Sequence, residues 1–184
     1  MQYEVNMQAL CALVHLAGKQ DIRWYLIGVC IEFRETETVY VATDGCVLGR
    51  YLDPQRNETP ASVIVPRDVI ERIKLHKVDH SAVLHVEDDG KRARLVYAAQ
   101  SVDVGFAPLD EKFLDWRPVV PSETSGEAGH FDVELLGKFV KVNKVFGKTF
   151  KPGVFRLRQN GPIGAALVEL VNTKFLGVIM PVRL

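Results

Sequence analysis

The sequence predicts an α+β protein in which one small unit is used three times: a strand, a helix and three more strands. Three observations predict this. A helical stretch recurs three times after a short extended run, segments rich in β-branched residues follow each helix, and turn-forming residues separate the segments. We call the repeated unit a half-module. Its order of elements gives antiparallel sheets that bury one face against helices.

The first half-module fills roughly the first third of the chain. A strand at residues 3–5 leads into an apolar helix at 7–17, and the side-chain oxygen of Asn6 can cap the first turn of this helix. Strands are expected at 24–33, 38–43 and 46–52, where valine and leucine side chains favour a sheet.

The second half-module begins with an extended run at 62–66. This run ends at a proline, whose fixed φ suits the start of a helix, and the helix is expected at 67–78. Strands are expected at 82–87, 92–98 and 101–106. Asp88-Asp89-Gly90 joins the first two of these strands, because such residues tolerate the positive φ of a hairpin turn.

The third half-module starts near His130, after small polar residues at 122–129 that mark a linker. Asp132 can cap a helix that ends at Gly147. Strands are expected at 154–159, 165–171 and 176–181, the first two joined by an Asn-Gly turn. One half-module cannot bury both its helix and its sheet, so half-modules should pair, and an odd number leaves one that needs a partner.

The composition argues against several classes of protein. The net charge is zero, so any nucleic-acid contact needs a local basic face. The three cysteines lack CxxC spacing and are expected to be reduced core residues; they are Cys11, Cys30 and Cys46. The chain has no signal-peptide start and no stretch of membrane-span length, so we expect a cytoplasmic protein without a membrane partner.

The sequence holds no arrangement of residues typical of catalysis. It has no Ser/His/Asp pattern, no glycine-rich loop that cradles phosphate before a helix, and no zinc-ligand spacing. We therefore expect a protein that is not an enzyme and that carries neither a metal nor another cofactor.

Five short segments carry a family resemblance. They are DIRWYLIG at 21–28, ATDG at 42–45 followed by Leu48, SVIVPR at 62–67, FLDWRPVVP at 113–121 and VIMPVRL at 178–184. In order and spacing they resemble the DxRYYLNG, ATDGHRL, SVIVPRK, FPDYRRVLP and VVMPMRL segments of the bacterial DNA polymerase sliding clamp, the beta subunit of the replicase. The resemblance implies the DNA-clamp fold: a complete clamp-like domain at 1–121, a linker at 122–129 and a single half-module with the C-terminal tail at 130–184.

The resemblance also implies a function. It is that of a DNA-replication accessory or processivity factor that oligomerises, encircles double-stranded DNA without sequence preference and binds peptides of polymerases or other clamp-binding proteins. Known clamps share a ring of about twelve half-modules, and about four copies of this chain would supply that number. The alternative is an adaptor or competitor at the replisome that binds proteins without encircling DNA.

A peptide-binding pocket beside the C-terminal tail is implied by the same resemblance. Its residues would be Leu26, Thr43, Gly45, Leu48, Val119, Val178, Met180, Pro181, Val182, Arg183 and Leu184. An apolar groove suits a Leu or Phe anchor, and methionine adapts to different ligands. The sequence departs from the family pattern at four positions: Cys46 and Val47 stand where the family has His-Arg, Leu114 replaces a proline and Pro118 replaces an arginine. These departures are expected to reduce the polar contacts around the groove. The alternative is that the pocket residues simply pack the core and the domain junction.

A DNA-facing surface is the second implied site. By resemblance it would contain Gln20, Arg23, Trp24, Tyr25 and Arg67. The third helix adds Lys138, Lys141 and Lys144, whose spacing of three places them near one face, as a phosphate-facing stripe requires. The alternative is a solvated lysine face. The first helix is apolar nearly all round, which favours burial at an interface over a place in a DNA channel.

Overall fold

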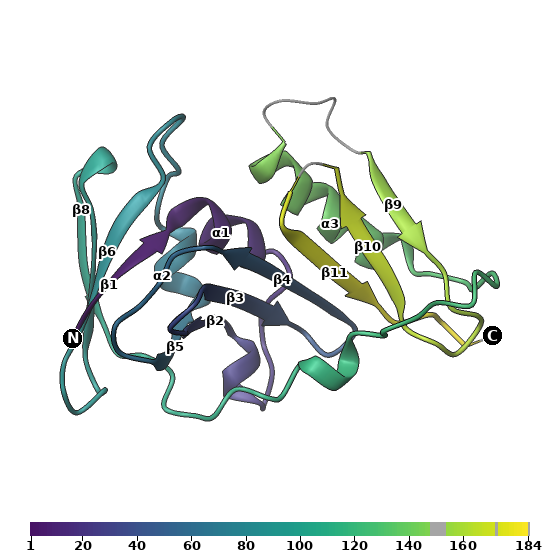
Figure 1. Cartoon of the computed structure of the whole chain (residues 1–184), viewed down its shortest axis with the longest axis horizontal. Helices are drawn as coiled ribbons and strands as arrows, with labels where there is room; N and C mark the ends of the chain where they lie inside the picture. Colours follow the sequence, from purple (N-terminus) through teal and green to yellow (C-terminus); the bar gives the residue numbers. More distant parts are fainter. Residues whose placement is uncertain (148–153, 172, 184) are drawn as a thin grey trace.

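The computed structural model describes residues 1–147, 154–171 and 173–183, which form two antiparallel sheets backed by α-helices (Figure 1). The first half-module contains β1 (Gln2–Asn6), α1 (Met7–Leu13), the 3-10 helix η1 (Trp24–Leu26), β2 (Gly28–Phe33), β3 (Thr38–Thr43) and β4 (Val47–Asp53). The second contains β5 (Ala61–Pro66), α2 (Arg67–Glu71), β6 (Ser81–Val86), β7 (Ala93–Tyr97), the 3-10 helix η2 (Ala98–Gln100) and β8 (Val102–Phe106). After the 3-10 helix η3 (Arg117–Val119), the third contains α3 (Val133–Phe146), β9 (Phe155–Arg158), β10 (Ala166–Leu170) and β11 (Phe175–Ile179). The predicted α+β class with antiparallel sheets is confirmed.

The first two half-modules exchange their first strands. β1 pairs antiparallel with β6, so the smaller sheet has the order β1-β6-β7-β8. β5 in turn pairs antiparallel with β2 of the first half-module. Each of these half-modules therefore completes the sheet of the other.

The third half-module continues the larger sheet. β11 pairs antiparallel with β4, which gives the order β5-β2-β3-β4-β11-β10-β9. Helices α1 and α3 pack against each other over this joint. The third half-module was expected to need a partner. On its β11 side this expectation is wrong, because β11 pairs with β4 of the same chain.

The apolar helix α1 is buried inside the chain. Its side chains Met7, Leu10 and Leu13 have no solvent exposure and belong to the main core between helices and sheets. Asn6 caps it as expected, accepting hydrogen bonds from the backbone N–H groups of Gln8 and Ala9 at 3.0 and 3.2 Å. The interface predicted for this helix is therefore an internal one.

Several element bounds differ from the sequence prediction. The first helix ends at Leu13, and the residues up to Ala17 form turns. The second ends at Glu71 instead of 78. The N–H of His76 donates to the Tyr97 hydroxyl at 3.0 Å and that hydroxyl donates to the Asp79 carbonyl at 2.5 Å, which holds this stretch in an irregular conformation. The strand expected at 24–33 begins at Gly28, and the third half-module has no strand between η3 and α3.

Turn and cap residues of the later half-modules behave as predicted. Gly90 and Gly161 have φ of +69° and +77°, values that favour glycine. Asp132 accepts a hydrogen bond from the N–H of Glu134 at 2.7 Å and so caps α3, which ends before Gly147.

Candidate functional site

The turn between β3 and β4 has a rigid polar framework. The Thr43 hydroxyl donates to the Val47 carbonyl at 2.6 Å and accepts from the N–H of Gly45 at 3.1 Å. One carboxylate oxygen of Asp44 accepts from the N–H groups of Cys46 and Val47, both at 2.9 Å. Gly45 has a φ of +93°, which explains the glycine at this position.

The C-terminal tail lies against this turn. Leu48 on β4 is the direct strand partner of Val178 on β11, and the N–H of Met180 donates to the Cys46 carbonyl at 2.9 Å. The N–H of Val182 donates to the His130 carbonyl at 2.7 Å, which directs the tail past the start of α3. Two predicted pocket motifs more than 130 positions apart in the chain are thus brought together by one strand pairing.

The predicted pocket residues divide into covered and open ones. Leu26, Leu48 and Val178 are at most 2% exposed, whereas Val119, Met180 and Val182 are 37–40% exposed. Pro181 is half-buried and Arg183 is exposed, while Leu184 lies outside the described residues. The predicted pocket residues on the strands are therefore covered, while Met180 and Val182 of the tail and Val119 of η3 are open to solvent.

The segment that connects β8 to α3 covers the face of the larger sheet opposite the helices. Phe113 and Trp116 are buried there in a second apolar cluster with Leu48, Val178 and other sheet residues. Tyr25 contacts the Phe113 ring edge-on, with the ring centroids 6.2 Å apart. Tyr25, predicted to face DNA, is therefore partly buried on this outer face.

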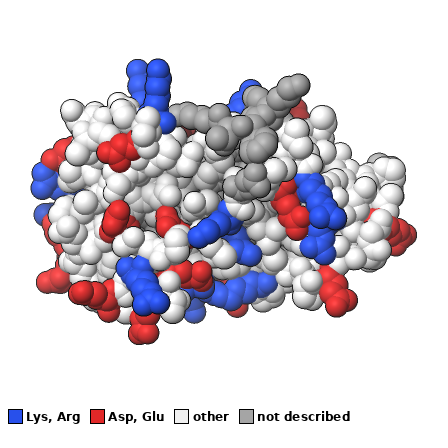
Figure 2. Space-filling model, turned by 45° about the horizontal axis from the view of Figure 1, so that its top comes forward, with Lys and Arg blue, Asp and Glu red and all other residues white. Residues whose placement is uncertain are grey.

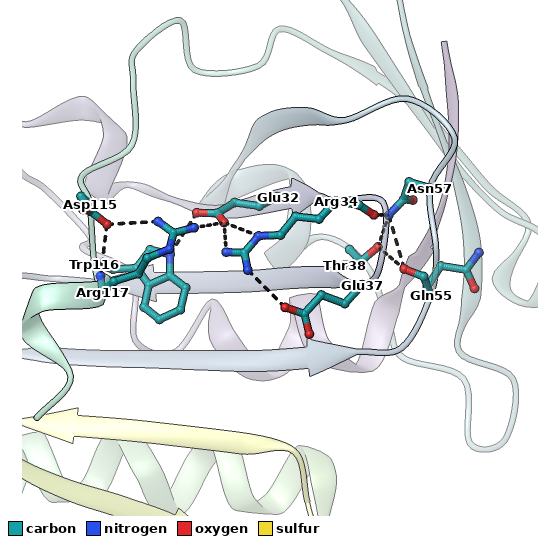
Figure 3. A network of polar contacts seen from close by, with 9 residues as sticks. All are labelled: Glu32, Arg34, Glu37, Thr38, Gln55, Asn57, Asp115, Trp116 and Arg117. Carbon is teal, nitrogen blue, oxygen red and sulfur yellow. Dashed lines mark hydrogen bonds and ion pairs between the residues drawn. The ribbon is translucent and has the colours of Figure 1, made fainter. Parts of the chain in front are cut away.

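A polar network fastens the connecting segment to the sheet (Figure 3). Glu32 on β2 accepts hydrogen bonds from the indole N–H of Trp116 at 2.9 Å and from the Arg117 guanidinium at 2.8 Å. Arg34 pairs with the same carboxylate and with Glu37. Burial alone would raise the pKa of Glu32, but the hydrogen bonds from Arg34 and Trp116 and the charges of Arg34 and Arg117 outweigh it and hold the pKa below its usual value. No spacing in the sequence signals this network, because its partners lie about 85 positions apart.

Arg67 has a structural role that differs from the predicted contact with DNA. Its guanidinium donates to the carbonyls of Val14 and Ala17 at 2.9 and 2.8 Å, and to the carboxylate of Glu71 at 2.7 Å. The side chain is only 11% exposed. Val14 is the C-cap residue of α1 and Ala17 lies in the stretch that follows, so the Arg67 cation satisfies one carbonyl at the helix end and one just beyond it.

Arg23 and Lys138, both predicted to face DNA, lie at the turn between β3 and β4. Arg23 pairs with both carboxylate oxygens of Asp21, and its guanidinium lies over Gly45. Lys138 pairs with Asp44, and its side chain is 27% exposed. Lys138, the first member of the predicted lysine stripe, therefore has a carboxylate partner within the chain, and the contact of the stripe with DNA stays a prediction.

The remaining predicted DNA contacts are open to solvent. Gln20, Trp24, Lys141 and Lys144 are all exposed. Burial lowers the pKa of the nearby His15, and the charges of Lys141 and Arg67 lower it further. On the face shown in Figure 2, Lys and Arg atoms are interspersed with Asp and Glu atoms.

The cysteines differ in their surroundings. Cys30 is buried, which raises the pKa of its thiol to about 12, and Cys11 is half-buried. Cys46 is exposed, so the prediction of a core residue is wrong there, because the Asp44 turn directs the chain outward. In the parts of the chain that the structure describes, no group of three or more His, Cys, Asp or Glu side chains could hold a metal ion. Within the same residues, no helix is both long and apolar enough to span a bilayer.

Comparison with solved structures identifies the fold. The beta subunit of DNA polymerase III from Pseudomonas aeruginosa superposes with a TM-score of 0.74 at 17% identity, over 100% of this chain and 66% of that one. The same subunit from Borrelia burgdorferi, in complex with a natural product, gives 0.75 at 12% identity, over 100% and 63%. The Helicobacter pylori beta clamp bound to a DNA ligase peptide gives 0.72 at 15% identity, over 100% and 66%.

These similarities show that the chain has the fold of the bacterial sliding clamps and spans about two thirds of their length. No protein-family model matches the sequence, and no curated protein is similar to it in sequence. The predicted clamp resemblance is confirmed at the level of fold.

Proposed function

We propose that this chain is a sliding-clamp-like accessory factor of DNA replication that binds short peptides of polymerases or related proteins beside its C-terminal tail. The observation that carries the proposal is that the Thr43–Leu48 turn and the Val178–Arg183 tail lie side by side. They are joined by the pairing of β4 with β11 and by the hydrogen bond from the N–H of Met180 to the Cys46 carbonyl. The H. pylori clamp of the same fold was solved with a DNA ligase peptide, which supports this class of partner.

The exposed apolar residues of the tail and of η3 are suited to peptide recognition. Val119, Met180 and Val182 offer an apolar surface, and Arg23 and Lys138 lie at the neighbouring turn. A peptide with a Leu or Phe anchor and an acidic neighbour fits such a combination of apolar and basic groups. Entry of the anchor side chain between Leu48 and the tail would require the tail to move, since Leu48 and Val178 are buried.

The peptide site is tested by a binding measurement. The variant Met180→Ala with Arg183 and Leu184 deleted should bind a fluorescent clamp-motif peptide at least tenfold more weakly than the wild type in an anisotropy titration. Val133→Ala, another exposed apolar residue, is the matched control and should keep the wild-type affinity. Equal affinity of the tail variant and the wild type would contradict the proposed site.

DNA encirclement is the second part of the proposed function. It requires self-association, because the chain supplies three half-modules, and a basic inner surface to which Lys141 and Lys144 would contribute. Such contacts are with phosphates and weaken steeply as salt rises.

A topological experiment tests encirclement. If the protein encircles DNA, it should stay on nicked circular plasmid during gel filtration and leave the same plasmid after linearisation. Replacing Lys141 and Lys144 by Glu should reduce retention at low salt, whereas replacing Lys74 and Lys77 by Glu should not. Equal behaviour on circular and linear plasmid would exclude a ring.

The second candidate function is an adaptor that binds clamp-type peptides without encircling DNA. The internal partners of Arg67 and Lys138, together with the zero net charge, favour it over a DNA-gripping role. An adaptor would pass the peptide test and fail the plasmid test.

A further inference from the structure

A groove of about 850 Å³ lies beside the start of β5. It is bordered by β5, by the turn between β6 and β7, and by the segment that connects β8 to α3. In Figure 1 this connecting segment runs along the lower edge of the molecule, beneath β5. None of the residues predicted for the peptide-binding pocket or for the DNA-facing surface lines the groove, so it is a separate surface.

The floor of the groove is apolar. Val63, Ile64 and Val86 line it and are at most 6% exposed. Leu109 and Leu114 also line it and are half-buried, so part of their apolar surface stays open to a ligand. An apolar side chain placed against these residues would be removed from water. The volume is within the range of about 300–1,000 Å³ that is common for ligand sites.

β5 also presents backbone groups to the groove. The Ile64 carbonyl accepts a hydrogen bond from the N–H of Leu109 at 3.1 Å, whereas the N–H of Arg67 donates to Ile27 on the side of β2. Backbone groups alternate in direction along an antiparallel strand, so Ser62 points its N–H and C=O to the same side as Ile64, away from β2. Within the described residues these two groups of Ser62 have no hydrogen-bond partner. They are therefore available to the backbone of an extended ligand.

The charged side chains around the groove are mainly acidic. Six of them are acidic and three are basic, although the chain as a whole has no net charge. Asp88 lies 3.9 Å from the terminal ammonium group of Met1. The excess of negative charge is a local property of this surface, and it favours a cationic partner over nucleic acid. The acidic residues are Glu32, Asp88, Asp89, Asp110, Glu111 and Asp115.

Two of these carboxylates are free to meet a partner. Arg117 pairs with both Glu32 and Asp115, so these two acids already have a cation beside them (Figure 3). Asp110 and Glu111 are exposed, and within the described residues they form no hydrogen bond or ion pair through their side chains. A cationic side chain that enters the groove therefore meets these two acids without first displacing another cation.

We propose that this groove binds an extended basic segment of a partner protein. The backbone of the segment bonds to Ser62, an apolar side chain occupies the floor, and Lys or Arg side chains meet Asp110 and Glu111. Successive side chains of an extended segment point to opposite sides, so a segment in which apolar and basic residues alternate suits both the floor and the acidic border. This binding is additional to the proposed function, because no residue of the tail site lines the groove.

A peptide titration tests the acidic border. The probe is a short fluorescent peptide of alternating lysine and leucine with both ends blocked, so that only side chains carry charge. Asp110→Asn with Glu111→Gln should weaken its binding roughly fivefold at low salt, because two exposed charge pairs are lost. Glu123→Gln with Glu127→Gln removes the same charge from another exposed part of the chain and should keep the wild-type affinity. Equal affinity of the Asp110 and Glu111 variant and the wild type would overturn the proposal.

Two further comparisons test the floor and the backbone contact. The same peptide with serine in place of leucine should bind more weakly; if it binds as tightly, the attraction is ionic only and the groove is not a peptide site. Ser62→Pro removes the outward N–H and should weaken binding of the lysine and leucine peptide, whereas Ser62→Ala keeps the N–H and should not. Circular dichroism checks that both variants are folded. Equal binding by the two variants would contradict the backbone contact.

The tail variant separates this groove from the proposed function. Met180→Ala with Arg183 and Leu184 deleted should bind the basic peptide as the wild type does. Loss of the basic peptide in that variant would place its binding at the tail and overturn the groove. If the wild type binds the basic peptide but no clamp-motif peptide, the groove stands and the peptide site of the proposed function fails. The reverse result removes the groove alone.

Discussion

β4 and β8 occupy the same place in two copies of one repeat, yet of these two strands only β4 has a neighbour on its outer side among the described residues. At β4, the partner strand β11 and the packing of α1 on α3 bury the inward residues Val47 and Gly49. At β8, the inward side chains are half-exposed. The difference teaches that the repeat does not fix how deeply its last strand is buried. The burial depends on whether another strand pairs with it.

The largest expected difference between the two regions comes from replacing one glycine in each by alanine. A Cβ on Gly177 of β11 would lie 2.4 Å from the buried Phe139 ring and 3.1 Å from Val168, whereas a Cβ on Gly105 of β8 would lie 4.0 Å from its nearest neighbour. Gly177→Ala should lower the free energy of unfolding by about 2–3 kcal/mol through overpacking, and Gly105→Ala by no more than about 0.5 kcal/mol. Urea unfolding measures both. Equal losses would show that the two edges are packed alike.

A second contrast uses two arginines of the second half-module. Arg67→Ala leaves two carbonyls at the end of α1 without their donor and should cost about 1–2 kcal/mol. Arg94→Ala, on the exposed outer face beside β8, should leave the melting temperature unchanged. Thermal unfolding followed by circular dichroism compares them, and an unaffected Arg67→Ala would remove the capping role.

The turn beside the internal joint separates two contributions of Asp44. Asp44→Ala removes the acceptor for two backbone N–H groups and the partner of Lys138, and should cost about 1 kcal/mol. Asp44→Asn keeps the acceptor and should cost about half as much. If Asn were as damaging as Ala, the ion pair would carry the whole effect.

The smallest expected effect is a pH dependence that differs between the two regions. The pKa of Glu32 is lowered in the folded state, so the stability it contributes is present above the pKa of an unfolded glutamate, about 4.3, and is lost as the pH falls through the lower folded value. The advantage of wild type over Glu32→Gln should therefore shrink between about pH 5 and pH 3. The hydrogen bond from Arg94 also lowers the pKa of Asp103, but water screens this exposed pair beside β8, so Asp103→Asn should show a smaller change. Urea unfolding at several pH values gives both differences.

Local chemistry determined much of this protein from its sequence. Asn6 and Asp132 cap helices and Gly90 and Gly161 make turns, because such effects depend on residues a few positions apart. The order of strands and helices and the clamp-like fold followed from apolar patterns and from five short motifs. The peptide-site and domain assignments stay predictions.

Only the tertiary structure decided which edges pair and which charges stay free. The exchange of β1 and β5, the joining of β4 to β11 and the partners of Arg67 and Lys138 all link residues about 30 or more positions apart. Such contacts depend on which open edge and which unsatisfied carbonyl come to lie nearby, and no periodicity along the chain encodes that. Among the described residues, the same reasoning leaves β8 as one of the sheet edges without a neighbouring strand.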